Sequence, residues 1–292
     1  MSRADAVAAL RDRRSPESSQ LVTALGWLSP GLLGEIAMEA GGGDSADAMA
    51  IAAAAVAVDA AFVSAREPDS GDLVAALHAA DVAAIWTVDG VFARVAEAIG
   101  WTEALRMTAI DPGVITARLD EALGDAIVVT RRALQVGADA VLVADDLFGA
   151  AGPLISPDFA LDALVPCYHR LVLEAEGSGL PTVFHSDGDI RALMPALARA
   201  GFSAVHLAVE DVGAFTASAM AARRSGLVPL GGIAARSLVD GAREAGEHAA
   251  ATAASLGGVI VGDDGGLSAL VEFTAFGAAL EVAREAFLRI RG

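Results

Sequence analysis

The segment "PTVFHSDGDIRALMPALARAGFSAVHLAVED" occupies residues 181–211 and has a repeating pattern of apolar and polar residues. A short apolar run, Thr182–His185, leads into a turn of Ser, Asp and Gly, and a longer stretch with helical periodicity leads to a second apolar run, Ala204–Val209. Two such runs joined by a stretch long enough for a helix are typical of parallel strands with a crossover helix. The segment therefore predicts a strand–helix–strand unit.

The same alternation recurs on both sides of this segment. Including the two runs above, we predict eight strands, at Leu21–Trp27, Ala61–Ala65, Ala83–Val88, Ala140–Ala144, Thr182–His185, Ala204–Val209, Leu227–Leu230 and Val259–Val261. Eight strands alternating with helices, in a chain of 292 residues, are the pattern of a (β/α)8 TIM barrel. We therefore expect an α/β fold with one barrel domain over residues 1–292, preceded within it by a helical segment at about residues 1–20.

Several helix N-termini can be predicted, because a side chain that can cap a helix directly precedes a proline. Proline suits the first helical position, since its fixed φ is helical and its missing N–H has no partner there. These predicted starts are Ser15-Pro16, Ser29-Pro30, Asp111-Pro112 and Ser156-Pro157.

The composition excludes several classes of partner and reaction. The chain has 38 acidic and 20 basic residues and a net charge of −18, so a nucleic-acid backbone or an anionic membrane would be repelled. All basic residues are Arg, and the chain has neither Lys nor Asn. Without Lys, Schiff-base aldolases, pyridoxal-phosphate enzymes and P-loop phosphotransferases are excluded, because each needs a lysine amine.

The cysteine content and the apolar runs indicate a cytoplasmic location. The single cysteine, Cys167, cannot form an internal disulfide and lies in the helix-like stretch Val165–Leu173, which favours a buried structural thiol over a nucleophile. The Arg-rich N-terminus lacks the apolar stretch of a signal peptide. The most apolar run, Ala48–Val63, is mostly Ala and contains Asp59, so we expect a packed helix rather than a membrane span.

The candidate functional residues are the polar ones that follow the predicted strands, because the active site of a parallel barrel lies at the carboxyl ends of its strands. They are mainly acidic: Asp89, Asp145, Asp146, His185, Asp187, Glu210, Asp211, Asp263 and Asp264. Glycines near the same ends, Gly188, Gly231, Gly232, Gly262, Gly265 and Gly266, would let a ligand approach the backbone. Each Asp could equally cap a helix N-terminus.

The pair His185 and Asp187 is the strongest of these candidates, since His-x-Asp after a strand places two potential metal ligands on one turn. So many carboxylates at one mouth would repel each other unless a cation, an Arg or a shared proton offset them. His206 and Glu210 share a parity along the sixth strand and could both face the barrel interior. For His206 we favour a core histidine that a neighbour satisfies, and we assign no role to His78, His169 or His248.

Running segments resemble the uroporphyrinogen decarboxylase superfamily, which includes corrinoid-linked methyltransferases such as methylcobamide:coenzyme M methyltransferase. "GADAVLVADDLFGAAGPLISPDFALDALVPCYHRLV" (Gly137–Val172) resembles the family's strand, Asp-Asp turn and Ser-Pro-capped helix. Residues 181–211 resemble the next strand–helix–strand step, with His-Ser-Asp-Gly where methyltransferase members carry His-x-Cys-Gly. "GGIAARSLVDG" (231–241) and "GGVIVGDDGG" (257–266) are similar to the last two strands. The resemblance covers roughly Asp89–Phe287.

The resemblance implies a metal site. Methyltransferase members hold a zinc ion through this His, the Cys two residues on, and a second Cys at the end of the last strand. By this resemblance, His185 corresponds to the family's His and Asp187 to the first Cys. Asp264, or else Asp263, corresponds to the second Cys. Carboxylates favour harder ions, although zinc with His and carboxylates is also a catalytic set. We expect His185, Asp187 and Asp264 to hold a divalent ion, zinc by resemblance, whose identity stays open.

The function that the resemblance implies is metal-assisted methyl transfer to or from a small molecule, with a methylated corrinoid or another methyl donor. The corrinoid would come on a separate partner protein, because this chain has no second domain to carry it. We expect His185, Asp187 and Asp146 as catalytic residues. The expected substrate-binding residues are Asp145, Asp89, Glu210 and Gly232. The two neighbouring acids at 145 and 146 would position the substrate or take its proton.

Two alternative functions stay open, as does whether the protein is a monomer or a homodimer. The first alternative is a decarboxylase of uroporphyrinogen or another tetrapyrrole. Decarboxylase members carry an Arg-rich segment near the N-terminus and a Gly-His-Gly motif near the C-terminus, but Leu21–Pro30 has no arginine and Gly265-Gly266 stand where that histidine would be. An acidic mouth would also repel a polycarboxylate porphyrinogen. The other alternative is a non-catalytic relative that binds a corrinoid or a metabolite.

Overall fold

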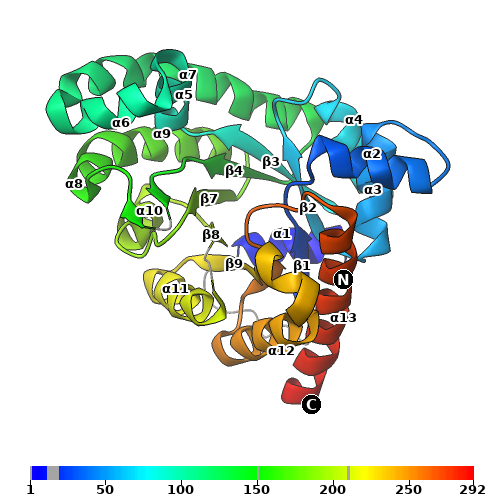
Figure 1. Ribbon diagram of the computed structural model, residues 1–292. Coiled ribbons are helices and arrows are strands. Elements are labelled where there is room, and N and C mark those ends of the chain that lie inside the picture. The colour runs from blue at the N-terminus through cyan, green and yellow to red at the C-terminus, as the bar shows by residue number, and fades with distance from the viewer. Residues whose placement is uncertain (1, 12–19, 150, 209–210) are drawn as a thin grey trace.

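The computed structural model describes residues 2–11, 20–149, 151–208 and 211–292, and their core is a closed barrel of eight parallel strands (Figure 1). The order around the barrel is β1-β10-β9-β8-β7-β4-β3-β2, and β1 pairs with both β10 and β2 to close it. The barrel strands are β1 (Val22–Leu25), β2 (Ala60–Ser64), β3 (Ala83–Asp89), β4 (Ala140–Ala144), β7 (Thr182–Asp187), β8 (Ala204–Ala208), β9 (Val228–Ile233) and β10 (Ile260–Asp263). All eight predicted strands and the TIM-barrel fold are confirmed.

Helices connect the strands and surround the barrel, with α5, α6 and α7 together at one side and α12 beside α13 at another (Figure 1). The helices are α1 (Arg3–Arg11), α2 (Pro30–Glu39), α3 (Ser45–Ala55), α4 (Ser70–Ala79), α5 (Val91–Ile99), α6 (Trp101–Ile110), α7 (Pro112–Val136), α8 (Pro157–Phe159), α9 (Val165–Glu176), α10 (Met194–Ala200), α11 (Val212–Ser225), α12 (Leu238–Leu256) and α13 (Leu270–Arg291). A π-helical turn at Ala160–Leu164 and a 3-10 turn at Ala235–Ser237 complete the helical elements. The loop after β4 contains a small antiparallel pair, β5 (Phe148–Gly149) and β6 (Gly152–Pro153).

The Ser/Asp-Pro pairs mark helix starts as predicted wherever the structure describes them. Ser29 caps α2, because its hydroxyl accepts a hydrogen bond from the amide of Leu32 at 3.2 Å. Asp111 and Ser156 directly precede α7 and α8, although neither side chain makes a capping hydrogen bond. The pair Ser15-Pro16 lies outside the described residues.

The hydrophobic core has an inner and an outer layer. Inside the barrel, side chains such as Phe62, Leu142 and Leu230 pack together, and α1 covers one end of them with Leu10. Arg3 of α1 binds Asp139, the residue that precedes β4, so α1 lies at the amino end of the barrel. The carboxyl ends of the strands are therefore at the end of the barrel opposite α1.

The apolar run Ala48–Val63 is not one helix, which corrects the prediction. Helix α3 ends at Ala55, and strand β2 begins at Ala60 after a left-handed turn at Ala57 (φ 51°). No described helix is long and apolar enough to cross a membrane. Cys167 lies in α9, buried, and its thiol donates to the carbonyl of Ala163 at 3.5 Å, which is the packed helical position expected for a structural thiol.

Candidate metal centre

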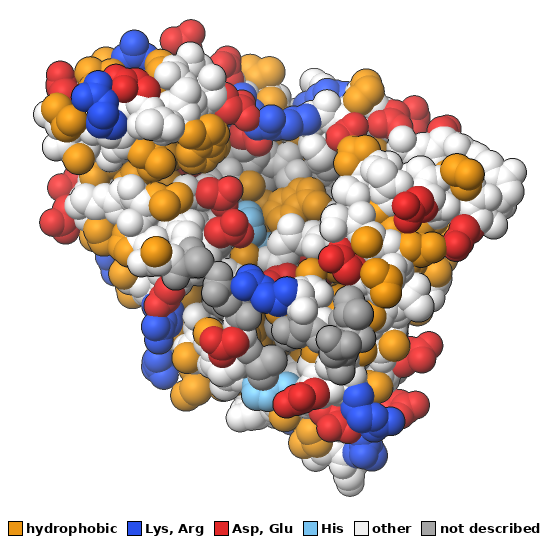
Figure 2. Space-filling model, in the orientation of Figure 1, with side chains coloured by type: hydrophobic (Ala, Val, Ile, Leu, Met, Phe, Trp, Pro, Cys, Tyr) orange, Lys and Arg blue, Asp and Glu red, His pale blue; other side chains and the backbone are white. Residues whose placement is uncertain are grey.

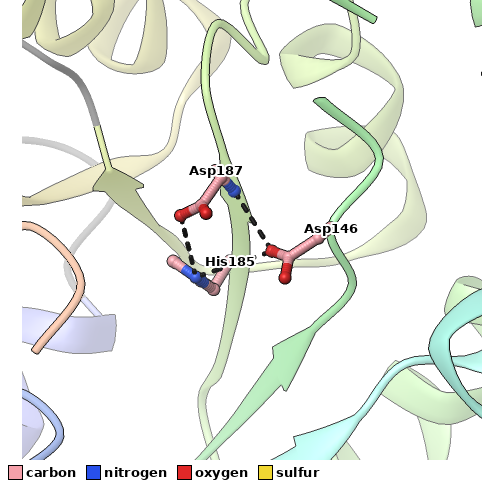
Figure 3. Close-up of side chains that lie close together, drawn as sticks. All are labelled: Asp146, His185 and Asp187. Carbon is pink, nitrogen blue, oxygen red and sulfur yellow. Dashed lines mark hydrogen bonds and ion pairs between the residues drawn. The ribbon is translucent and has the colours of Figure 1, made fainter. Parts of the chain in front are cut away.

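Three predicted site residues meet at the carboxyl ends of two neighbouring strands. Asp146 follows β4, and His185 and Asp187 lie on β7, which pairs with β4 (Figure 3). Nε2 of His185 is 3.9 Å from Oδ1 of Asp146 and 3.8 Å from Oδ1 of Asp187. One ligand atom from each residue lies within 4.8 Å of the other two. The three side chains are thus close enough to share one metal ion.

This acidic cluster, Asp146–His185–Asp187, is buried on its histidine side and open on its carboxylate side. The His185 side chain is 7% exposed, whereas those of Asp146 and Asp187 are 48% and 60% exposed. Figure 2 shows a hollow at the centre of this face, with a histidine and acidic side chains on its wall and hydrophobic side chains deeper inside. A small molecule can therefore reach the carboxylates from solvent.

His206 on β8 determines which nitrogen of His185 carries the proton. Nε2 of His206 is 2.9 Å from the backbone carbonyl of Asp263, and a carbonyl only accepts, so this nitrogen must carry a hydrogen. In a neutral ring Nδ1 of His206 is then an acceptor, and it lies 2.9 Å from Nδ1 of His185. Nδ1 of His185 therefore donates, and Nε2 presents its lone pair to Asp146 and Asp187.

Both histidines are held in the neutral form. Burial lowers the pKa of His206 to about 4. Burial, followed by repulsion from His206, lowers the pKa of His185 well below its ordinary value. A neutral imidazole whose free nitrogen faces outward is the form that binds a metal ion.

The two carboxylates of the cluster are costly in their ionised form. Burial raises the pKa of Asp146. Burial, followed by the negative charges of Asp146 and Asp264, raises the pKa of Asp187 to about 6. The cluster thus brings three acceptor atoms together, and one of them, Oδ1 of Asp146, also accepts a hydrogen bond from the backbone amide of Asp187 at 3.3 Å. A cation would offset the repulsion between the two carboxylates. One imidazole nitrogen with two carboxylate oxygens fits zinc, manganese or iron.

Trp27, which was not among the predicted site residues, forms an aromatic wall beside the cluster. Its ring centroid lies 4.9 Å from that of His185 and 5.7 Å from that of His206, both in edge-on arrangements. Phe62 on β2 packs against His206 in the same way at 5.0 Å. The only sequence signal for Trp27 is an aromatic residue at the end of the first apolar run.

Asp264, the predicted third ligand, lies outside the close group of three. Its Oδ1 accepts a hydrogen bond from the amide of Ala235 at 3.0 Å. It is near enough for its charge to raise the pKa of Asp187. In the described part of the chain, Asp146 takes the place in the cluster that the resemblance gives to Asp264.

Asp145 points away from the mouth and caps helix α5. Its carboxylate accepts hydrogen bonds from the amides of Phe92 (2.9 Å) and Ala93 (2.7 Å) and from the hydroxyl of Tyr168 (2.7 Å). Burial raises its pKa to about 7, although all three hydrogen bonds act in the opposite direction. The structure therefore places Asp145 under the N-terminus of α5, whereas the sequence predicted it at the mouth of the barrel as a substrate-binding residue.

The remaining predicted residues are also separate from the cluster. Asp263 is buried and accepts hydrogen bonds from the amides of Gly26, Gly265 and Gly266, which ties the end of β10 to the segment after β1. The carboxylate of Asp89 is held by Arg66, whose Nε donates to both of its oxygens.

Gly232 and the acidic residues after β8 complete the set. Gly232 has φ +104°, and a Cβ there would lie 2.7 Å from the Phe215 ring, so packing and backbone conformation both require glycine. Asp211 caps α11 by accepting from the amide of Ala214 at 2.8 Å. Glu210 lies outside the described residues.

Comparisons with known proteins agree with this architecture. The family model described as "Uroporphyrinogen decarboxylase (URO-D)" matches residues 72–253, more than half of the chain, and this range includes the acidic cluster. The fold is similar to that of a methyltransferase from Methanosarcina mazei, with a TM-score of 0.75 and 14% identity over 98% of this chain and 99% of that chain. It is also similar to D-psicose 3-epimerase from Clostridium cellulolyticum H10, with a TM-score of 0.53 and 12% identity over 82% of this chain and 92% of that chain. Comparison with curated proteins gives no match. At these identities the structural likenesses show the barrel fold alone.

Proposed function

Because this chain belongs to the uroporphyrinogen decarboxylase family, we propose that it is an enzyme of that family and transfers a methyl group with a divalent ion held by Asp146, His185 and Asp187. The observation that carries this proposal is the lone pair of His185 Nε2 facing two carboxylates at the open end of the barrel. The fold of a solved methyltransferase, matched over almost its whole length, supports the choice of reaction. The proposed donor is a methylated corrinoid on a partner protein, and the acceptor is a small molecule.

The residues of the chain have distinct parts in this proposal. A bound divalent ion would act as a Lewis acid that lowers the pKa of an acceptor thiol. His185 and the two carboxylates would hold that ion. His206 and the carbonyl of Asp263 would position the His185 ring and keep its Nε2 free of a proton. The exposed sides of Asp146 and Asp187 would admit the acceptor from solvent.

Zinc affinity is expected to fall as the pH drops below about 6. The pKa of Asp187 is about 6, so below that pH the carboxyl group holds a proton that zinc must displace, while above it no such competition exists. We expect a loss of about tenfold per pH unit below the pKa, which competition with a chromophoric chelator between about pH 5 and pH 7.5 would measure. An affinity that stays constant over this range would contradict the assignment of Asp187 as a ligand.

His206→Phe is expected to weaken zinc binding by about 10- to 100-fold, although His206 is not one of the proposed zinc ligands. The variant removes the acceptor for Nδ1–H of His185 and leaves a ring of similar size beside Phe62 and Trp27. His206→Gln keeps an acceptor oxygen and should lose less affinity. Equal zinc affinity in wild type and His206→Phe, measured by calorimetry on folded protein, would refute the positioning role.

The activity itself is testable with methylcobalamin as a free methylated corrinoid and 2-mercaptoethanol as a neutral thiol. The cobalt–carbon bond would break, its electron pair would stay on cobalt, sulfur would gain the methyl group and the thiol proton would pass to solvent. We expect cob(I)alamin, detected anaerobically by its absorbance, and the methyl thioether, both dependent on zinc. Absence of both products with the zinc-loaded enzyme would count against methyl transfer.

Decarboxylation is the second candidate, favoured by one observation. Asp187 has a pKa of about 6, so it could deliver a proton to a carbon that has lost carbon dioxide. Incubation of metal-free protein with uroporphyrinogen, followed by chromatography of the oxidised products, tests this activity. Loss of carboxyl groups without metal would favour the decarboxylase, and binding of a corrinoid with neither turnover would favour a non-catalytic relative.

A further inference from the structure

A second hollow lies beside the acidic cluster, at the carboxyl ends of β1 and β2 and against helices α2 and α3. It has a volume of about 320 Å³, within the range of small-molecule sites. Its lining is mainly apolar and includes Trp27, Leu33, Ala37, Met49, Phe62 and Leu73. We call it the apolar cavity.

Trp27 connects the apolar cavity to the acidic cluster. The Trp27 ring lines the cavity and packs edge-on against Phe62, another lining residue, with ring centroids 4.9 Å apart. The same ring lies 4.9 Å from the ring of His185. The Trp27 ring is therefore shared: it lines the apolar cavity and also contacts the imidazole of the acidic cluster.

The charges around the cavity disfavour an anionic ligand. The charged residues that line it are Asp44 and Glu67, and no Arg is among the described lining residues. Asp44 is already used, since its Oδ1 accepts from the amide of Asp47 at the start of α3. A carboxylate or sulfonate would lose hydration here without a cationic partner, whereas an apolar group gains by leaving water.

We propose that the small-molecule substrate of this enzyme is a neutral thiol whose apolar group occupies the apolar cavity, while its sulfur faces Asp146, His185 and Asp187. The position of the sulfur rests on the proposed function. The preference of the cavity for a neutral apolar group rests on its lining alone. The cavity therefore determines which acceptor the enzyme takes.

The direct test compares two matched thiols, phenylmethanethiol and 4-(mercaptomethyl)benzoate, which differ only by a carboxylate. Calorimetry with the zinc-loaded protein should give at least about tenfold tighter binding of the neutral thiol. Equal or tighter binding of the carboxylate would overturn the proposal. So would tighter binding of the para-aminomethyl analogue, which would show selection for a cation.

Ala37→Phe tests the location, because Ala37 is half-buried and lines the cavity, so a phenyl ring there would fill it. Met38→Phe is the matched control on the same helix, since Met38 is 80% exposed and does not line the cavity. Binding of phenylmethanethiol should weaken at least about tenfold in the first variant and stay unchanged in the second. Equal affinity in both variants would refute the location.

Toluene, which has no thiol, separates this inference from the proposed function. An apolar cavity half this size can bind benzene without any polar partner. Saturable binding of toluene by metal-free wild type and Met38→Phe, lost in Ala37→Phe, would support the cavity even if the protein held no zinc. If zinc binds but toluene binding is absent or insensitive to Ala37→Phe, the proposal for the cavity fails while the metal site stands.

Discussion

His185→Ala is expected to lower zinc affinity by more than about 100-fold, a larger loss than that expected for the supporting residue His206, and to abolish zinc-dependent methyl transfer. His185 supplies the only nitrogen ligand of the close group, and without it Asp146 and Asp187 remain as two repelling carboxylates. Equilibrium dialysis followed by elemental analysis would measure the zinc bound by wild type and variant.

Two further variants make this test discriminating. Asp187→Ala should lose zinc as His185→Ala does, whereas Asp264→Ala should keep it, because the Asp264 carboxylate is held by the amide of Ala235 outside the close group. Thermal unfolding of the metal-free proteins would show that the variants are folded. Stoichiometric zinc in folded His185→Ala would refute the proposed site. Loss of zinc in Asp264→Ala would instead support the ligand set that the family resemblance implies, in which Asp264 is a ligand.

Asp145→Ala is expected to lower the free energy of unfolding by about 3 kcal/mol or more. The change leaves the amides of Phe92 and Ala93 and the hydroxyl of Tyr168 without their acceptor, all in the buried layer under α5. Unsatisfied buried donors cost about 1 to 3 kcal/mol each, although a water that enters the space can recover part of this. Urea unfolding followed by circular dichroism would measure the difference.

A control variant, Asp120→Ala, and the zinc affinity of Asp145→Ala show whether Asp145 caps α5 or acts in the metal site. Asp120 pairs with Arg170 at 3.0 Å but its side chain is 91% exposed, so Asp120→Ala should change stability by less than about 0.5 kcal/mol. Folded Asp145→Ala should bind zinc as wild type does. A stability equal to that of wild type would contradict the capping role. Loss of zinc binding from a folded Asp145→Ala protein would instead show that the carboxylate acts at the metal site.

The barrel could be predicted because the same sequence pattern, an apolar run followed by a helical stretch, recurs along the chain and has a clear physical cause. Parallel strands covered on both faces need continuous apolar runs, and eight such runs separated by helical stretches leave few other architectures. The observed strands begin and end within a few residues of the predicted ones. The split of Ala48–Val63 into helix and strand was missed because a run of Ala and Val has no helical or alternating period to separate the two.

The positions of Asp145 and Asp146 could not be read from an Asp-Asp motif alone. Along β4, Leu142 faces the barrel interior and Val143 faces the helices, so the alternation sends Asp145 outward and Asp146 to the mouth. The same alternation places His185 and His206 inside, where Val183 and Ala204 also point. The alternation of side chains along each strand could therefore have separated Asp145 from Asp146. It can be used only once it is known which residues of the strand face the barrel interior.

The contacts of Asp264 and Trp27 could not be predicted from the sequence. The expectation for Asp264 came from its place in the family's pattern, whereas its side chain is bound by a backbone amide that no motif specifies. Trp27 meets His185 only because barrel closure brings the end of β1 across from β7. Contacts of this kind depend on the tertiary structure and leave no local pattern.

The proposed metal site is tested most directly by locating zinc in the wild-type protein, by anomalous diffraction at the zinc edge on crystals soaked in a zinc salt. We expect one strong anomalous peak about 2.0–2.2 Å from Nε2 of His185 and from a carboxylate oxygen of both Asp146 and Asp187. No peak at these residues, or a sole peak elsewhere such as at Asp264 or Glu272, would refute the proposed site.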